Sequence, residues 1–154
     1  MCGLSVIINI LNKQVSTDLM KKITDIIKHR GPDGEGYYYG KNVAFGHRRL
    51  AIIDLEERAN QPFEGPDGLV MTYNGEIYNY LELQDELKSL GYTFKTKSDT
   101  EVLLAAYHCW RVDFLRKLMT YISTRLKIKL VRYNVFFCRL DCIQRRKALY
   151  KIAF

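Results

Sequence analysis

The sequence predicts one domain that mixes strands and helices, followed by an extension of different composition. Its 154 residues suffice for a hydrophobic core, and 47% hydrophobic with 27% charged residues is ordinary for a globular protein. Residues 3–9 are rich in β-branched residues, which indicates a buried strand. Apolar Leu19, Ile23, Ile26 and Ile27 recur at helical spacing in residues 16–29, which predicts a surface helix packed by that face.

The composition changes near Arg111. Residues 1–110 hold 12 Lys and Arg against 15 Asp and Glu, a net charge of −3, whereas residues 111–154 hold 12 against 2, a net charge of +10. All ten glycines and all three prolines lie in the first part. Such a shift marks a boundary.

Between the first helix and the centre of the chain, the pattern indicates loops and short strands. Residues 29–34 are dense in turn formers, and their glycines lack the strand and helix of a nucleotide-binding fingerprint. Residues 37–39 and 43–45 are expected to be two strands. Arg48 and Arg49 precede a further expected strand at 50–55. The arginines are either a solvated pair or a fork that holds a carboxylate at a strand edge. Residues 56–68 form a polar connection.

The most informative stretch is residues 69–79, which run into and out of Asn74-Gly75. Locally this predicts strand, turn and strand, because Asn-Gly is a strong hairpin signal. The turn also presents a carboxamide, an unhindered glycine N–H and the carboxylate of Glu76. Two neutral donors that converge on one point can hold an oxyanion.

Two capped helices and a short strand at 92–96 are expected after this turn. Asn79, with Glu82 three residues on, predicts the start of a helix that ends at Gly91. Residues 98–101 (Ser-Asp-Thr-Glu) form a second capping box, which opens a helix to residue 110. Asp99 either complements the helix dipole or binds a ligand if the helix start faces a pocket.

Cys2 is either a small apolar residue at a strand start or a nucleophile. Removal of Met1 would give Cys2 a free α-amine beside its thiol. An α-amine has a pKa of about 7.7–8.0, which suits a base at neutral pH. One residue would then supply both nucleophile and base.

The four cysteines point to reduced thiols in the cytoplasm, because no basic leader or signal peptide precedes them. The spacing of Cys138 and Cys142 is at most half a metal site, and the three histidines complete no ligand pattern, so no metal is expected. No run reaches the roughly 18 apolar residues of a membrane span.

Together these motifs resemble the class II glutamine amidotransferase domain of glutamine-hydrolysing asparagine synthetases. The resemblance covers residues 1 to about 118. The matching segments, in family order, are residues 1–3, 29–34, 46–55, 61–62, 74–79, 91–92 and 98–101.

The resemblance implies an α+β N-terminal-nucleophile fold, an αββα sandwich of two antiparallel sheets between helical layers. It also implies that glutamine is hydrolysed to glutamate and ammonia through a thioester on Cys2, with Asn74 and Gly75 as the oxyanion donors. Arg49 would bind the α-carboxylate of glutamine, and Asp99 with Glu76 the α-ammonium. The pocket would be lined by Leu50, Ala51, Ile52 and Ile53.

The family pattern is lost after residue 118, so residues 119–154 are expected to be a divergent basic tail and residues 1–118 a truncated domain. The family glycine that follows the tryptophan is Arg111 here. The tail places Leu115, Leu118, Met119, Ile122 and Leu126 at helical spacing, which predicts a basic amphipathic helix or an accidental, poorly folded segment.

The resemblance also implies a partner that this sequence does not contain. In the family, ammonia passes to a synthetase domain that amidates aspartate with ATP and magnesium, so the present residues need no cofactor of their own. The alternative is an inactive remnant whose basic tail binds an acidic partner, either nucleic acid or anionic lipid.

Overall fold

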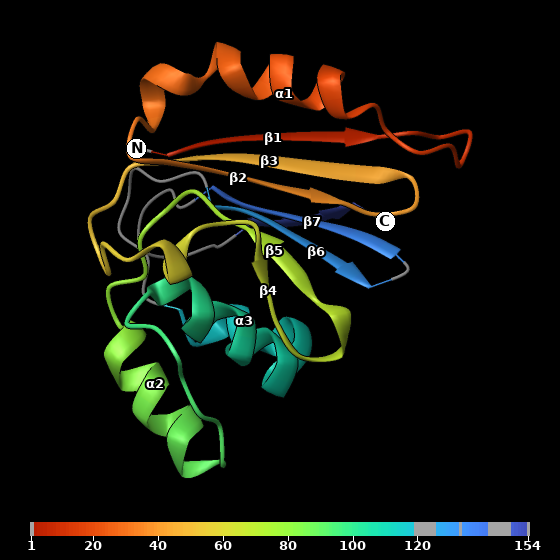
Figure 1. The fold of residues 1–154 in the computed structure, drawn as a ribbon. Helices are drawn as coiled ribbons and strands as arrows, with labels where there is room; N and C mark the ends of the chain where they lie inside the picture. The colour runs from red at the N-terminus through yellow and green to blue at the C-terminus, as the bar shows by residue number, and fades with distance from the viewer. Residues whose placement is uncertain (1, 119–125, 133, 142–148, 154) are drawn as a thin grey trace.

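The computed structural model describes residues 2–118, 126–132, 134–141 and 149–153, which form four layers (Figure 1). Helix α1 (Thr17–Ile26) covers an antiparallel sheet with the strand order β1-β3-β2. A second antiparallel sheet, ordered β4-β5-β6-β7-β8, lies below it. Helices α3 (Asp99–Trp110) and α2 (Tyr80–Ser89) lie below that sheet. The predicted αββα sandwich is confirmed.

The strand predicted at 3–9 is confirmed one residue shorter, and those at 37–39 and 43–45 are confirmed within longer strands. The first sheet consists of β1 (Gly3–Ile8), β2 (Gly34–Tyr39) and β3 (Val43–Arg49). The second consists of β4 (Phe63–Glu64), β5 (Val70–Thr72), β6 (Leu126–Arg132), β7 (Asn134–Asp141) and β8 (Leu149–Ala153). Short 3₁₀ helices span Lys28–Arg30, Glu57–Ala59, Pro66–Gly68 and Arg111–Arg116.

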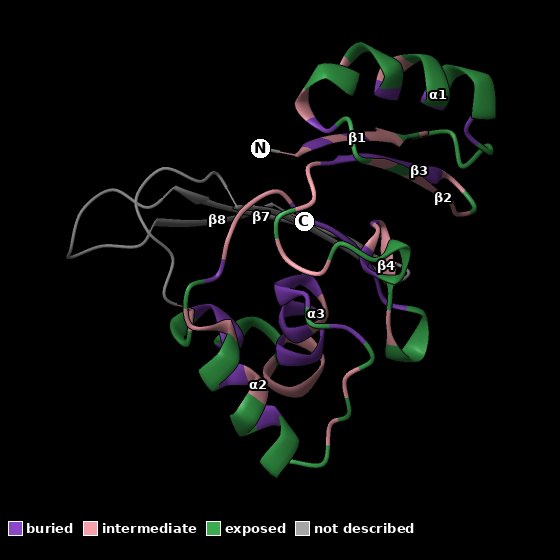
Figure 2. Ribbon diagram, turned by 60° about the vertical axis from the view of Figure 1, so that its left-hand side comes forward, coloured by how far each residue is buried: buried purple, intermediate pink, exposed green. Residues whose placement is uncertain are grey.

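The predicted helix at 16–29 is confirmed as α1, but only part of its predicted face, the half-buried Ile23 and Ile27, is turned away from solvent. Leu19 and Ile26 are exposed, whereas Met20 and Thr24 are fully buried (Figure 2). The reason is Gly46 of β3, where an added Cβ would lie 2.0 Å from the Thr24 hydroxyl. The helix therefore settles on the glycine and turns two of its aliphatic side chains towards solvent.

The main core lies between the second sheet and α3, the most buried helix (Figure 2). Its fully buried side chains come from β5, α2, α3 and the segment after α3: Met71, Leu87, Val102, Leu103, Leu104, Ala106 and Phe114. Within the described ranges, no helix is long and apolar enough to cross a membrane.

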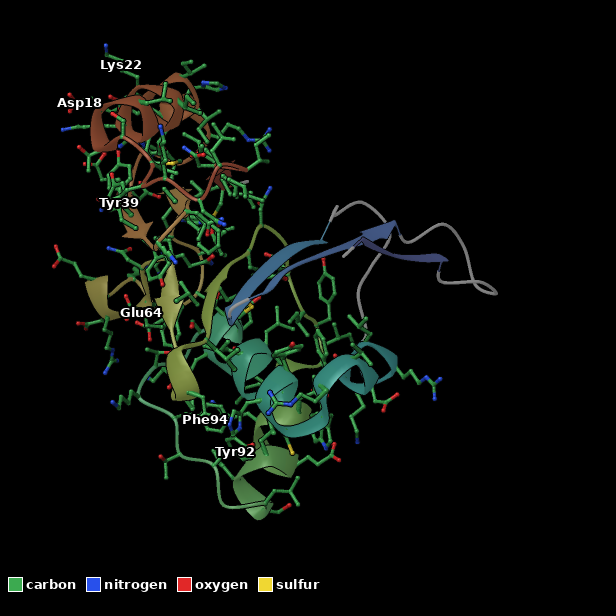
Figure 3. The ribbon with its side chains drawn as sticks, turned by 90° about the vertical axis from the view of Figure 1, so that its right-hand side faces the viewer. Asp18, Lys22, Tyr39, Glu64, Tyr92 and Phe94 are labelled. Atoms are coloured by element: carbon green, nitrogen blue, oxygen red, sulfur yellow. The ribbon has the colours of Figure 1, made fainter. Side chains whose placement is uncertain are left out.

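Two predicted strands are absent because side chains occupy the backbone groups that a neighbouring strand would need. In residues 50–55, the Arg49 guanidinium takes the carbonyl groups of residues 53 and 54. In residues 92–96, the Glu101 carboxylate accepts the N–H groups of residues 95 and 96 at 2.7–3.1 Å. Tyr92 and Phe94 pack beside α2 and α3 instead (Figure 3).

The predicted strand after Asn74-Gly75 is also absent, so the turn is not the tip of a hairpin. The chain runs from β5 through residues 73–79 directly into α2. The Ile77 N–H donates to the Asp99 carboxylate at 3.4 Å, not to a strand. This irregular path brings residues 74–76 towards the start of α3.

The helix ends follow the predicted capping only in part. The Ser98 hydroxyl accepts the Glu101 N–H at 3.4 Å, but the Glu101 carboxylate reaches back past Ser98, so the box is half made. The Asn79 side chain does not cap α2; it donates to the carbonyl oxygen of Lys117 at 2.8 Å. Gly91 does end α2, with a φ of 92° that suits glycine.

The predicted tail helix is wrong where the structure describes it. Residues 119–125, with two of the five apolar positions, lie outside the described residues. Leu126 begins β6, whose residue Leu130 pairs with Met71 of β5. Without β6, strand β5 would leave its hydrogen-bonding groups open at a sheet edge. The domain boundary at residue 118 stays a prediction. Strands on both sides of that residue belong to one sheet.

Replacing Arg111 by glycine should stabilise the protein. Arg111 follows α3 with φ 51° and ψ −134°, a region that only glycine adopts without strain. The Arg111→Gly variant should unfold with a free energy about 1 kcal/mol higher, measured by urea denaturation.

The matched control is Arg111→Ala, which keeps the strained backbone and loses the guanidinium that lies 5.8 Å from the Tyr107 ring. It should be no more stable than the parent chain. Equal stability of the glycine and alanine variants would contradict the prediction.

Candidate active site

A pocket of about 220 Å³ opens where the start of β1, the loop after β3, the turn after β5 and the start of α3 meet. Nine of the ten predicted site residues line it. Its walls are formed by Cys2, Arg49, Leu50, Ile52, Ile53, Ala59, Gln61, Tyr73, Asn74, Gly75, Glu76, Tyr78, Ser98, Asp99 and Thr100. The exception is Ala51, which faces a neighbouring hollow and donates its N–H to the Asp33 carboxylate at 2.9 Å.

The thiol of Cys2 is held against the loop that follows β3. The Leu50 N–H donates to the sulfur at 3.3 Å, and the thiol lies 3.6 Å from the Leu50 carbonyl oxygen. Arg30 donates from Nε to the Cys2 carbonyl oxygen at 3.2 Å. Cys2 is half-buried and lines the pocket. Its backbone is held by Arg30, the last residue of the 3₁₀ helix Lys28–Arg30.

Arg49 organises the loop that forms one wall of the pocket. Its Nη1 donates to the Glu56 carbonyl oxygen at 2.9 Å and to the Asn60 side chain at 3.0 Å. Its Nη2 donates to the carbonyl oxygens of Ile53, at 3.0 Å, and Asp54. Arg49 is only 7% exposed, so it is not part of a solvated pair, and it is the last residue of β3, the middle strand of the first sheet.

The turn that carries Asn74 and Gly75 is fixed by the backbone of Tyr73. The Tyr73 N–H donates to Gln61 Oε1 at 2.5 Å, and its carbonyl oxygen lies 3.3 Å from His47 Nε2. The Tyr73 ring lies against Gly75, where an added Cβ would come within 2.7 Å of a ring carbon. Glycine is therefore required here by close approach, and its N–H stays unhindered.

The pocket wall at the start of α3 holds a buried negative charge. Asp99 is only 8% exposed, and burial raises its pKa to about 6 although the N–H groups of Ile77 and Thr100 oppose the shift. The carboxylate of Glu76 raises the pKa further. Burial, followed by the charges of Asp99 and Glu76, also raises the pKa of Tyr73. This end of the pocket is therefore suited to a cation.

His47 joins the two sheets beneath the site. Its ring is fully buried, and burial lowers its pKa to about 4, with the positive charge of Arg49 acting in the same direction. The neutral ring can donate from Nε2 to the Tyr73 carbonyl oxygen, which lies just beyond β5.

Sequence reasoning missed three residues that shape the site: Gln61, Tyr73 and His47. Each occurs in or next to a motif that pointed to the family, but each acts through one contact between segments distant in the chain. Position within a motif was the one available signal.

A profile of the glutamine amidotransferase domain family matches residues 1–123. The chain belongs to this family. The predicted relationship to the amidotransferase domain of asparagine synthetases is confirmed, because similar proteins carry that name. Glutamine-hydrolysing asparagine synthetase 1 of Bacillus subtilis (strain 168) is 49% identical over 102 residues, which are 66% of this chain and 16% of the relative.

Two further relatives extend the match within this chain. Asparagine synthetase 2 of the same bacterium is 41% identical over 119 residues, 75% of this chain and 16% of the relative. A probable asparagine synthetase of Dictyostelium discoideum is 38% identical over 122 residues, 77% of this chain and 22% of the relative. The amidotransferase domain thus spans only a small part of the length of the curated relatives it matches.

The buried, neutral His47 should make stability fall in acid. The unfolded chain takes up the proton near pH 6.5 and the folded chain only near pH 4, so the free energy of unfolding should fall by about 3 kcal/mol between these values. His47→Gln removes this titration and keeps a donor for the Tyr73 carbonyl. The variant should therefore gain stability relative to the parent as the pH falls.

The measurement is urea unfolding of both proteins at several pH values from 7.5 to 4. Asp99 titrates in the opposite direction, but it is present in both proteins and cancels in the difference. A difference in unfolding free energy that stays constant over this range would show that His47 is not held neutral.

Proposed function

We propose that this domain hydrolyses glutamine to glutamate and ammonia with Cys2 as the nucleophile. The observation that carries the proposal is the pocket itself. A thiol, two oxyanion donors and a buried carboxylate surround one space of about 220 Å³. The matching family supports the same chemistry.

In the first half of the reaction, the α-amine of Cys2, freed by removal of Met1, takes the proton of its own thiol. The sulfur then attacks the side-chain amide carbon of glutamine, and a C–S bond forms. The resulting oxyanion is held by the Asn74 carboxamide and the Gly75 N–H, each worth about 2.7–4 kcal/mol in comparable sites.

In the second half, the tetrahedral intermediate breaks its C–N bond, and the Cys2 ammonium protonates the leaving nitrogen, which departs as ammonia. The remaining thioester is attacked by water, whose proton passes to the Cys2 amine. The C–S bond then breaks, the sulfur recovers its proton, and glutamate leaves.

The charged end of glutamine would be held at the far end of the pocket from the sulfur. Asp99 with Glu76 would pair with the α-ammonium. Arg49 would attract the α-carboxylate, through Nε or by exchanging a loop carbonyl from one Nη. The apolar side chains of Leu50, Ile52 and Ile53 would pack along the aliphatic part.

The ammonia would serve the synthesis of asparagine. The relatives' names couple glutamine hydrolysis to asparagine synthesis, and their length leaves room for a further domain. We propose that such a domain, with ATP and magnesium, receives the ammonia from this one.

Replacing the proposed nucleophile should abolish glutamate release. Cys2→Ala should lower the rate by at least about 10³-fold, because Cys2 is the one thiol that lines the pocket among the described residues. The measurement is glutamate released from glutamine by the purified protein, with removal of Met1 verified by mass spectrometry.

The matched control is Cys109→Ala, which removes a half-buried thiol outside the pocket. Its rate should equal that of the parent chain. A folded, Met1-free parent that releases no glutamate would contradict the proposed function.

Replacing Asp99 by asparagine should stabilise the protein and weaken the binding of glutamine. Above pH 6 the folded state carries the unfavourable Asp99 charge, so Asp99→Asn should raise the unfolding free energy by up to about 3 kcal/mol at pH 8, with no gain at pH 4. The same variant should raise the KM for glutamine at least tenfold, because the α-ammonium loses its partner.

Urea unfolding at the two pH values and steady-state kinetics measure the two effects. Asp18→Asn, on the outer face of α1 and outside the pocket (Figure 3), is the control and should leave the KM unchanged. An Asp99→Asn variant with an unaltered KM would remove Asp99 from the binding site.

A further inference from the structure

One buried carboxamide joins the two functional ends of the pocket. Gln61 Oε1 accepts the Tyr73 N–H at 2.5 Å, and Nε2 of the same group donates to the Thr100 hydroxyl at 3.0 Å. Tyr73 immediately precedes the oxyanion donor Asn74, and Thr100 immediately follows Asp99. A single planar group therefore connects the turn where the oxyanion forms to the helix start where the ammonium binds.

The backbone of Gln61 is itself anchored. Gly36 of β2 lies so close that an added Cβ would come within 2.2 Å of the Gln61 carbonyl oxygen. The Gln61 side chain is also buried, with 8% of the residue exposed. The Gln61 backbone thus lies against β2, and its buried carboxamide has little freedom to change hydrogen-bond partners.

The Tyr73 N–H depends on this contact. Tyr73 follows Thr72, the last paired residue of β5, so no neighbouring strand accepts the Tyr73 N–H. Without Gln61, the N–H would be a buried donor with no acceptor, which costs about 1–3 kcal/mol. The turn would relieve that cost by moving, and the donors at Asn74 and Gly75 would move with it.

We propose that Gln61 is a positioning residue that couples ammonium binding at Asp99 to the geometry of the oxyanion turn. This inference rests on the proposed glutaminase function. An α-ammonium that pairs with Asp99 fixes the first turn of α3, including the Thr100 hydroxyl. Through the planar carboxamide, that fixes the Tyr73 N–H and the two donors beyond it.

The coupling makes a distinctive prediction about substrate choice. An amide that lacks the α-ammonium would bind more weakly and would also react more slowly, because the oxyanion turn would be poorly aligned. The pocket would therefore select amino-acid amides over simple amides in kcat as well as in KM.

The test compares glutamine with 4-carbamoylbutyrate, which is glutamine without its amino group. In the parent chain, loss of the amino group should lower kcat by about 10–100-fold as well as raise KM. In Gln61→Met, which matches the side chain in length but forms no hydrogen bond, kcat for glutamine should fall. The ratio of the two kcat values should then approach one.

Two further variants separate positioning from packing. Thr100→Val cuts the same connection from its other end and should also collapse the kcat ratio, whereas Thr100→Ser keeps the hydroxyl and should restore it. Gln14→Met, at an exposed glutamine, controls for the substitution itself. The Thr100 pair also decides the question if Gln61→Met does not fold.

The outcomes distinguish this inference from the function on which it rests. An active parent whose kcat ratio survives both Gln61→Met and Thr100→Val would overturn the coupling alone. A folded, Met1-free parent that releases no glutamate from glutamine would overturn the proposed function and the coupling together.

Discussion

The site depends on how the backbone of one residue, Tyr73, is held where β5 ends. Its N–H is bonded to Gln61 and its carbonyl oxygen lies within reach of His47, so both backbone groups are fixed by side chains from other segments. His47 belongs to the first sheet and Tyr73 follows a strand of the second. The contact that joins the two sheets therefore also orients Asn74 and Gly75. Packing of the sandwich and alignment of the turn are one constraint.

Local signals predict several single elements, whereas the sandwich of two sheets is implied by the family resemblance. The strand at residues 3–9 and the caps at Ser98 and Gly91 need only neighbours in the chain. The absent strands at 50–55 and 92–96 could not be foreseen in this way. There the carboxylate of Glu101 and the guanidinium of Arg49 outcompete a partner strand, which depends on tertiary positions.

The candidate site shows the same division between local and tertiary information. Nine of the ten residues that the family motifs indicate line one pocket, and their roles there stay a prediction. Ala51 does not line this pocket, because its N–H donates to the Asp33 carboxylate and the residue faces the neighbouring hollow. The position of Gln61 in the site could not be predicted, because it depends on two hydrogen bonds to residues 12 and 39 positions away in the chain.

Two aspartates show what distinguishes a structural carboxylate from one suited to a ligand. Asp54 accepts the N–H groups of Lys97 and Glu56 and lies near Arg58, and these contacts lower its pKa. Asp99 also accepts backbone N–H groups, yet its pKa rises, because it is buried and the charge acting on it is the negative one of Glu76. Asp54 thus has its cation within the fold, in Arg58. At Asp99 the proposed function assigns that part to the α-ammonium of glutamine.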